Sequence, residues 1–363
     1  AITLKQYNPK HKGISMKKLL FIFCVILSLS LSAYADSKLT LIMAGDALLH
    51  ASVYNDAKRE NNHYDFSPML KALENVVPKY DLAFYNQETI LGGKELGLST
   101  YPAFNSPQEF GDNMLSLGFN LISLANNHTL DRGEKAIRSS LAYWKDKPAL
   151  TAGSYESFQT RNAPKILEKN GITYALLAYT YGTNGIPVPK GKEYLVNVYT
   201  KAMLEKDIKA IRDKVDLLIV SMHWGIEYEF EPSAEQKKYA KLLADLGVDL
   251  VIGTHPHVVQ PAEYIGNTLV FYSLGNLISA QKGTNKRIGM LGSVEIEKLE
   301  NGKVKVKNPR AELIYTYYNS RFKDFKLMWF SDLNNAILPD YKKIYKQYTN
   351  IITQGKSEIQ IGL

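Results

Sequence analysis

Residues 249–257 form an apolar, β-branched-rich run that ends in two histidines, His255 and His257, with Pro256 between them. In a continuing strand these two side chains would point to opposite faces. Pro256 fixes its own φ angle and has no backbone donor, so we expect a rigid corner at which both rings can turn inward. Neutral imidazole is a ligand for Zn, Fe, Mn and Ni. The pair therefore indicates a metal site, and the alternative is a pair of loop histidines bonded to backbone.

Four other apolar runs also end in side chains that can bind a cation. Their terminal residues are Asp46, Glu88, Asn127 with His128, and His223. In open α/β sheets, ligands bind just outside the carboxyl ends of the strands, so these side chains are expected to meet in one crevice. Taken singly, each residue has an ordinary interpretation as a turn, a helix cap or a loop. Their joint occurrence at five strand ends favours a site.

The elements that must position these residues follow a repeated order of strand, polar tip and helix. The expected strands include 38–46, 81–88, 119–128, 215–225, 249–257 and 268–276, and the expected helices include 67–77, 107–117, 131–145, 200–213 and 233–247. Ser233 and Gln236 occupy the positions of a capping box. Asn170-Gly171 predicts the turn of a hairpin over 165–179. This order predicts α/β architecture with an at least partly parallel sheet.

The amino-terminal residues have the composition of a targeting segment. Residues 1–15 precede the expected initiator, Met16, and are interpreted as an upstream extension or a cloning remnant. Residues 16–35 combine a basic start, an apolar run over 19–31 and small residues at Ala33 and Ala35, which is typical of a secretory signal cleaved after Ala35. We expect an exported protein, soluble in the periplasm or at the cell surface. The alternative is an N-terminal membrane anchor that is not cleaved.

The exported part of the chain has a mild charge and no thiol. Removal of residues 1–35 takes away five lysines and no acidic residue, so the net charge falls from +8 to +3. This balance, without a basic stripe, argues against nucleic acid as a partner. The single cysteine, Cys24, lies inside the signal, so neither a disulfide nor a thiolate ligand is expected. Any metal site must use His, Asp, Glu and Asn.

Six short motifs follow one another along the chain. They are Gly45-Asp46, Asn86-Gln87-Glu88, Ala125-Asn126-Asn127-His128, Met222-His223-Trp224-Gly225, Gly253-Thr254-His255-Pro256-His257 and Ser273-Leu274-Gly275-Asn276. In this order, over roughly residues 38–285, they resemble the CapA family of capsule and poly-γ-glutamate synthesis proteins. That family is similar in fold to the calcineurin-like metallophosphoesterases.

The resemblance implies a fold and a division of the chain. Residues 36–287 are expected to form a metallophosphoesterase-like four-layer α/β/β/α sandwich. Residues 288–363 are expected to form a C-terminal β-hairpin and helix extension packed on that domain. Within this tail, the residue pattern predicts hairpin strands at 294–299 and 304–317 and a last helix over about 332–348.

The resemblance also implies a site for two divalent metal ions. Asp46 would bind one ion and Glu88 would bridge both. The other ligands would be Asn127, His223 and His255 for the second ion and His257 for the first. His128 would be the general acid, or would orient a neighbouring ligand, beside the catalytic carboxylates Asp46 and Glu88. This ligand set suits Mn, Fe or Zn better than Ca or Mg.

One departure from the phosphoesterase pattern concerns the first metal. Those enzymes place a histidine two residues after the first aspartate, and here that residue is Leu48. His50 could replace it only if the loop bends back, and otherwise His50 is an ordinary loop residue. One metal instead of two is therefore the alternative.

Three further residues are candidates for contact with substrate or for support of the site. Arg132 could grip an anionic substrate, although a surface salt bridge is the commoner outcome. Trp224 could form a pocket wall for a polymer or pack in the core. Asn276 is expected to brace the site through hydrogen bonds.

The expected function is that of an exported CapA-like, metal-dependent hydrolase or transferase in the synthesis, attachment or turnover of a capsule or poly-γ-glutamate-type polymer. Its substrate would be an anionic surface polymer or a phosphoester. One alternative is a non-catalytic accessory subunit that holds the polymer or a membrane-bound polymer synthase. Another is a general metallophosphoesterase.

Overall fold

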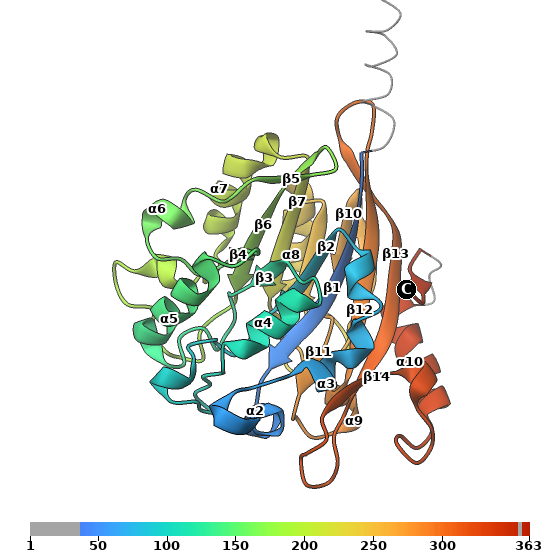
Figure 1. The fold of residues 1–363 in the computed structure, drawn as a ribbon. Coiled ribbons are helices and arrows are strands. Elements are labelled where there is room, and N and C mark those ends of the chain that lie inside the picture. Colours follow the sequence, from blue (N-terminus) through green and yellow to red (C-terminus); the bar gives the residue numbers. More distant parts are fainter. Residues whose placement is uncertain (1–36, 355–357) are drawn as a thin grey trace, which may run out of the picture. The chain divides into compact units, whose positions relative to one another are not determined.

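A sheet of nine strands and a sheet of six strands form the centre of the computed structural model, which describes residues 37–354 and 358–363 (Figure 1). The upstream extension and the signal predicted at 1–15 and 16–35 lie outside the described residues. Within the described part, no helix combines the length and apolar composition needed to cross a lipid bilayer.

The first sheet is mixed and contains the strand that ends in Asp46. Its strand order is β14 (Lys326–Trp329), β13 (Val304–Tyr317), β12 (Ile288–Lys298), β1 (Lys38–Leu48), β2 (Leu82–Asn86), β3 (Leu121–Ser123) and β4 (Leu150–Ala152). Two short strands, β11 (Asn276–Ser279) and β15 (Gln360–Ile361), pair with β1 and β13. Strands β1 to β4 are parallel, so their carboxyl ends meet at one edge.

The second sheet carries the histidine-bearing strands. Its order is β5 (Leu167–Lys169), β6 (Ile172–Thr180), β7 (Leu217–His223), β8 (Leu250–Thr254), β10 (Thr268–Phe271) and β9 (Ala262–Ile265). Strands β6, β7, β8 and β10 are parallel. The hairpin predicted at Asn170-Gly171 is confirmed, and both turn residues have positive φ, at 52° and 75°.

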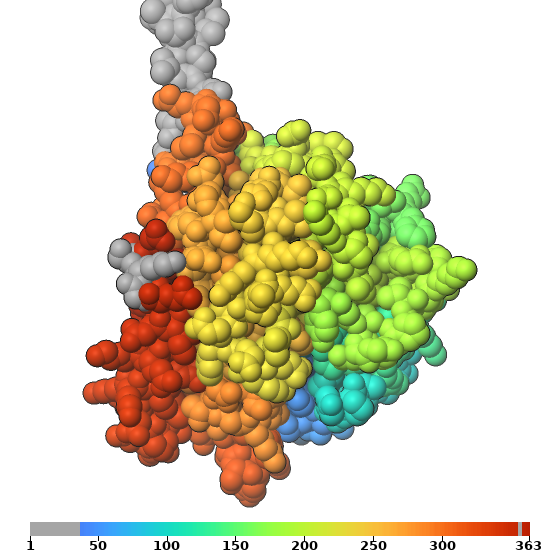
Figure 2. Space-filling view, turned by 180° about the vertical axis from the view of Figure 1, so that it is seen from behind, coloured from blue at the N-terminus to red at the C-terminus, as the bar shows by residue number. Residues whose placement is uncertain are grey.

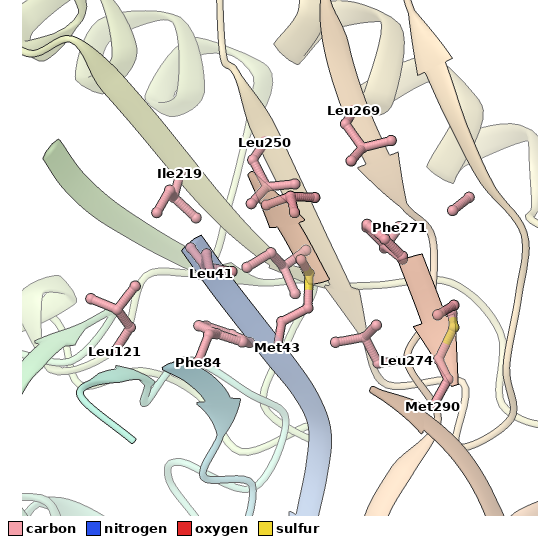
Figure 3. Close-up of a cluster of buried hydrophobic side chains, with 14 of the residues drawn as sticks. Leu41, Met43, Phe84, Leu121, Ile219, Leu250, Leu269, Phe271, Leu274 and Met290 are labelled. Atoms are coloured by element: carbon pink, nitrogen blue, oxygen red, sulfur yellow. The ribbon is translucent and has the colours of Figure 1, made fainter. Parts of the chain in front are cut away.

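The two sheets pack face to face through one apolar cluster. Along β1, Leu41 and Met43 point into this cluster, whereas Ile42 points to the opposite face of the sheet. Figure 3 shows Leu41 and Met43 meeting Ile219 and Leu250 of the second sheet. The alternation of side chains along each strand therefore gives each sheet one face for the other sheet and one for helices.

Helices cover both outer faces, so the predicted four-layer order of helices, sheet, sheet and helices is confirmed. The outer face of the first sheet is covered by α2 (Ala51–Ala57), α3 (Ser67–Leu70), α4 (Glu109–Ser116) and α5 (Gly133–Lys145). The outer face of the second is covered by α7 (Lys201–Ile211) and α8 (Ala234–Asp245). The capping box predicted at Ser233 and Gln236 starts α8. Two short helices, α6 (Phe158–Arg161) and α9 (Thr284–Arg287), lie in connections.

The carboxyl-terminal residues extend the first sheet. Strands β12 and β13 form the predicted hairpin, and β12 pairs directly with β1. The last helix, α10 (Tyr341–Thr353), starts later than predicted because Pro339 disfavours helical backbone in the residue before it. Figure 2 shows this red segment against the yellow part of the chain, where Phe230 contacts Tyr348 edge to face. A domain boundary between residues 287 and 288 stays a prediction.

Candidate metal centre

Asp46 lies where three strands of the first sheet meet. In the register of the sheet, Asp46 is opposite Asn86 of β2 and Asn276 of β11. The residue before it must be glycine, because a Cβ on Gly45 would lie 1.8 Å from the carbonyl oxygen of Gly275. This close approach of two backbones places acid and amide side chains together at the carboxyl end of β1.

The predicted corner after β8 has an unusual backbone. His255 and His257, on either side of Pro256, have φ angles of 99° and 59°. A non-glycine residue in this region costs about 1–3 kcal/mol and persists only where the surrounding structure holds it. Here the backbone N–H of His255 donates to Asp46 Oδ2 at 3.2 Å. The hydrogen bond to Asp46 therefore helps to hold the strained backbone of His255 in place.

Acid and imidazole groups from both sheets converge at this edge. Glu88 Oε1 lies 3.7 Å from His223 Nε2 and 3.7 Å from His257 Nε2. Asp46 lies 3.4 Å from His257 Nδ1 through one oxygen and 4.0 Å from His223 Nδ1 through the other. The rings of His223 and His255 are 4.8 Å apart between centroids. Five residues predicted as metal ligands therefore lie in one buried cluster.

The cluster contains polar atoms that lack partners. Both carboxylate oxygens of Glu88, Nδ1 of His255 and Oδ1 of Asn86 are buried and find no hydrogen-bond partner among the described residues. Each such group costs about 1–3 kcal/mol if it stays unsatisfied. Ligand atoms of Glu88, His255 and His257 lie within 4.8 Å of one another. The residues present fit a divalent cation, which would satisfy these atoms.

The electrostatics of the cluster agree with that fit. Burial, and to a lesser degree His257, lowers the pKa of His255 to about 3, so this ring is neutral and can act as a ligand. Burial also opposes the charge of His257, but Glu88 and Asp46 raise the pKa of His257 to about 9. Burial and Asp46 raise the pKa of Glu88 well above its usual value. The carboxylates of Glu88 and Asp46 therefore favour the protonated form of His257.

Asp46 and His223 are already held by protein groups. Besides the His255 amide, Asp46 accepts a hydrogen bond from Asn86 Nδ2 at 2.7 Å. His223 lies with Nε2 2.8 Å from Asn127 Oδ1 and with Nδ1 2.9 Å from Thr254 Oγ1. Asn127 and His223 are thus brought together as predicted, and their role as ligands stays a prediction.

His128 lies beside the cluster and is paired with an acid. Its Nδ1 is 2.7 Å from Asp131 Oδ2, and the same oxygen accepts the backbone N–H of Phe104 at 2.8 Å. The ring of Phe104 meets the His128 ring edge to face at 4.8 Å. Asp131 holds the proton on Nδ1 and leaves Nε2 as the atom that can accept or donate a proton.

Of the four supporting candidates, Asn276 lies at the site. Its Oδ1 is 2.9 Å from His257 Nδ1, while its amide nitrogen donates to Gln281 and to the carbonyl of Lys286. Arg132 forms no salt bridge among the described residues and instead donates to Leu96 O, Gly97 O and Ser99 Oγ. The guanidinium of Arg132 holds the 96–99 loop.

Trp224 and His50 are held by neighbouring groups. Trp224 is fully buried and donates through Nε1 to the carbonyl of Tyr272 at 2.9 Å, so of the two predicted places it takes the core. His50 has Nδ1 3.2 Å from Leu48 O and 3.3 Å from the Ala280 amide. Burial lowers the pKa of His50 to about 4. His50 is outside the group of mutually close carboxylate and imidazole ligands.

Several site residues were not identified from the sequence. Asn86, Asp131 and Thr254 contact predicted site residues, and each stands within three positions of one, which is the signal that could have found them. Tyr181 and Glu227 follow the ends of β6 and β7. Tyr181 packs on His255 with ring centroids 4.6 Å apart, and Glu227 Oε1 lies 3.9 Å from His257 Nε2. Both side chains are partly exposed, so they lie where the buried cluster meets solvent.

Several known proteins are similar to this chain. The Bacillus subtilis PGA biosynthesis protein CapA is 25% identical over 285 residues, which cover 75% of this chain and 72% of the relative. The Bacillus anthracis capsule biosynthesis protein CapA is 28% identical over 277 residues, which cover 74% of this chain and 66% of the relative. Among solved structures, the Haemophilus influenzae NAD nucleotidase aligns with a TM-score of 0.46 at 12% identity, over 90% of this chain and 64% of that one.

The family itself is given by a match to the whole region that carries the buried cluster. The model of the bacterial capsule synthesis protein PGA_cap matches residues 40–281, which include every residue of the cluster from Asp46 to Asn276. The order of motifs in the sequence and their convergence in the fold lead to the same assignment. This chain belongs to the bacterial capsule synthesis protein PGA_cap family.

Proposed function

We propose that this protein is a metal-dependent hydrolase or transferase that acts in the synthesis, attachment or turnover of a capsule or poly-γ-glutamate-type polymer. Family membership supports the role in polymer synthesis. The observation that carries the catalytic part is the buried Glu88 carboxylate. Neither of its oxygens has a hydrogen-bond partner among the described residues, and Oε1 lies 3.7 Å from both His223 Nε2 and His257 Nε2. A buried carboxylate without hydrogen bonds lowers the stability of the fold. Such groups are common at catalytic sites, where burial and neighbouring charges shift the pKa.

Two divalent ions, of Mn, Fe or Zn, are proposed for this centre, with one ion as the alternative. Glu88, His255 and His257 would hold an ion directly. Asp46, Asn127 and His223 would complete the set. When bound, the metal supplies Lewis-acid polarisation of a phosphoryl or carbonyl oxygen and stabilises the negative charge that develops on it.

The residues around the centre have distinct roles in this proposal. His128, with its tautomer fixed by Asp131, moves a proton to or from the substrate through Nε2. Asn276 orients His257, and Thr254 orients His223, each through a contact with ring Nδ1. Burial of the cluster excludes bulk water, which strengthens each of these interactions.

The proposed substrate is an anionic surface polymer or a phosphoester. Two relatives are named for PGA biosynthesis and capsule biosynthesis, which supports the polymer. A membrane-bound polymer synthase is the proposed partner. Export, with cleavage after Ala35, gives the protein access to such a polymer, and the basic and apolar composition of residues 16–35 supports it.

One observation favours the accessory subunit as a second candidate. Both Asp46 oxygens already accept protein hydrogen bonds, and Leu48 stands where the phosphoesterases have a histidine. A centre that holds metal weakly could bind the polymer or the synthase without turning it over.

Metal content separates the two candidates. Purified protein is loaded with Mn, Fe or Zn, dialysed and analysed for bound metal and for metal-dependent cleavage of an aryl phosphate and of poly-γ-glutamate. The enzyme is supported by near-stoichiometric metal that Glu88→Ala and His255→Ala remove together with cleavage. The accessory subunit is supported if no metal is bound and if Glu88→Ala and His255→Ala leave polymer synthesis in cells intact. Cleavage of aryl phosphate alone supports a general phosphoesterase.

A further inference from the structure

A separate cavity of about 480 Å³ opens between α10 and the edge strand β14. Its volume lies in the range of about 300–1,000 Å³ that small-molecule sites occupy. The lining residues that matter for its chemistry are Glu312, Trp329, Phe330, Tyr341, Lys342 and Tyr345. All lie beyond residues 40–281, and none belongs to the metal centre. Figure 1 shows α10 beside β13 and β14.

Four of the nine residues that line the cavity are aromatic. Tyr341 and Tyr345 are one helical turn apart on α10, so they face the same side. Tyr345 meets Phe330 with ring centroids 5.5 Å apart and an interplanar angle of 45°. Trp329 donates through Nε1 to the carbonyl of Ala72 at 3.0 Å. These contacts hold Phe330, Tyr345 and Trp329 in place.

One carboxylate lies in this aromatic wall. Glu312 accepts the backbone N–H of Leu313 at 2.9 Å through one oxygen and the hydroxyl of Tyr345 at 3.2 Å through the other. The side chain is half-buried, and burial raises its pKa above the usual value. Within the described residues, no lysine or arginine forms an ion pair with Glu312 or acts on its pKa. A carboxylate removed from water in this way is expected to have a cationic partner.

We propose that this cavity is a binding site for an organic cation that carries an alkylated ammonium group. Aromatic faces attract such a cation. Its bulky, weakly hydrated head group can pack against the apolar wall of the cavity, whereas a strongly hydrated metal ion cannot. A neutral apolar ligand would leave the Glu312 charge unpaired, and an anion would be repelled by it. Lys342 also lines the cavity; it is exposed, and its ammonium lies 5.9 Å from the Tyr341 ring centroid.

The test compares two probes of the same shape and different charge. Choline and its neutral isostere 3,3-dimethylbutan-1-ol are titrated into the purified full-length protein, with binding followed by calorimetry and by Trp fluorescence. Choline is expected to bind at least about tenfold more tightly than the isostere. Glu312→Gln is expected to remove that difference. Glu297→Gln is the matched control, because Glu297 lies on the neighbouring strand β12, is paired with Lys307 and is outside the cavity.

Two results would overturn the proposal. Equal affinity of both probes shows that the cavity selects apolar shape and not charge. Absence of choline binding up to roughly 50 mM, far weaker than a specific site, shows that the cavity is not a cation site. If Glu312→Gln does not fold, Tyr341→Leu removes one aromatic wall and must weaken choline binding while circular dichroism stays unchanged. None of these variants is expected to change the metal content of the proposed metal centre. A failure of this proposal can therefore be distinguished from a failure of the proposed function.

Discussion

At the amino end of the parallel strands, three aspartates are each paired within the protein. Asp81, Asp216 and Asp249 immediately precede β2, β7 and β8, and each accepts a backbone N–H from the neighbouring strand, from Thr40, Thr173 and Leu218. Asp216 and Asp249 also bind Lys298 and Arg212. Near the carboxyl ends of β2 and β8, Glu88, Asn86 and His255 keep buried polar atoms that find no hydrogen-bond partner among the described residues. Both ends carry polar side chains, and the difference is whether the fold gives their polar atoms hydrogen-bond partners.

This difference separates scaffold from site. A paired aspartate at a strand start fastens neighbouring strands together, and its loss should lower stability alone. An unpartnered glutamate at a strand end contributes little to stability, and its loss should remove function alone. The following variants test this division from the largest expected effect to the smallest.

Glu88→Gln should have the largest effect on function. The amide keeps the shape of the side chain but is a poor metal ligand, so bound metal should fall below stoichiometric amounts and metal-dependent turnover by roughly a thousandfold, about 4 kcal/mol. The melting temperature of the chelated protein should not fall, because both buried Glu88 oxygens lack a hydrogen-bond partner among the described residues. Metal analysis and thermal melts check both parts. A large loss of stability in the chelated variant would place Glu88 in the scaffold.

His128→Gln should lower turnover by about 10²–10⁴-fold, because the group that moves the proton is gone. Metal content should stay near that of the unaltered protein. Asp131→Asn should have a smaller effect on the same readout, since His128 remains but loses the acceptor that fixes its tautomer. Loss of metal in either variant would contradict the assignment of these residues to proton transfer.

Asp249→Asn should lower the free energy of unfolding by roughly 2 kcal/mol, because the Arg212 guanidinium loses its charged partner and the Leu218 amide its carboxylate acceptor. Denaturant unfolding measures this loss. Metal content should be unchanged. A variant that lost metal without losing stability would contradict the assignment of Asp249 to the scaffold.

Asp216 should give a small, pH-dependent effect. Burial opposes its charge, but hydrogen bonds from Lys298 and Thr173 outweigh burial and hold the pKa of Asp216 below its usual value. A depressed carboxyl pKa stabilises the fold above the pKa of the unfolded chain, about 4, and this contribution is lost as the pH falls through the folded value. Asp216→Asn should therefore cost about 1 kcal/mol at pH 7 and less at pH 3. Equal losses at both pH values would exclude this linkage.

Much of the site could be predicted because parallel strands bring their carboxyl ends to one edge. The convergence of Asp46, Glu88, His223 and His255 could be predicted from the ends of the strands alone, without the paths of the loops. The burial of Trp224 could also be predicted, because the residue after a strand-end histidine points to the opposite face of the sheet, where helices pack.

Other parts of the site depend on contacts that local sequence does not encode. Tyr181 and Glu227 reach the histidines through loops whose paths depend on neighbouring elements. The pairing of His128 with Asp131 requires the turn between them to bend, and its hydrogen bond to Phe104 comes from a loop elsewhere in the chain. Long-range packing decided these positions.

The hydrogen bond from the His255 amide to Asp46 joins residues 209 positions apart. Closing so long a loop carries an entropic penalty, and contacts of this separation tend to form late in folding. Nascent or truncated chains that end before residue 255 therefore lack the imidazoles needed to capture an ion. An ion that binds only the finished arrangement would in turn stabilise it by mass action, so uptake of metal would mark the completion of folding.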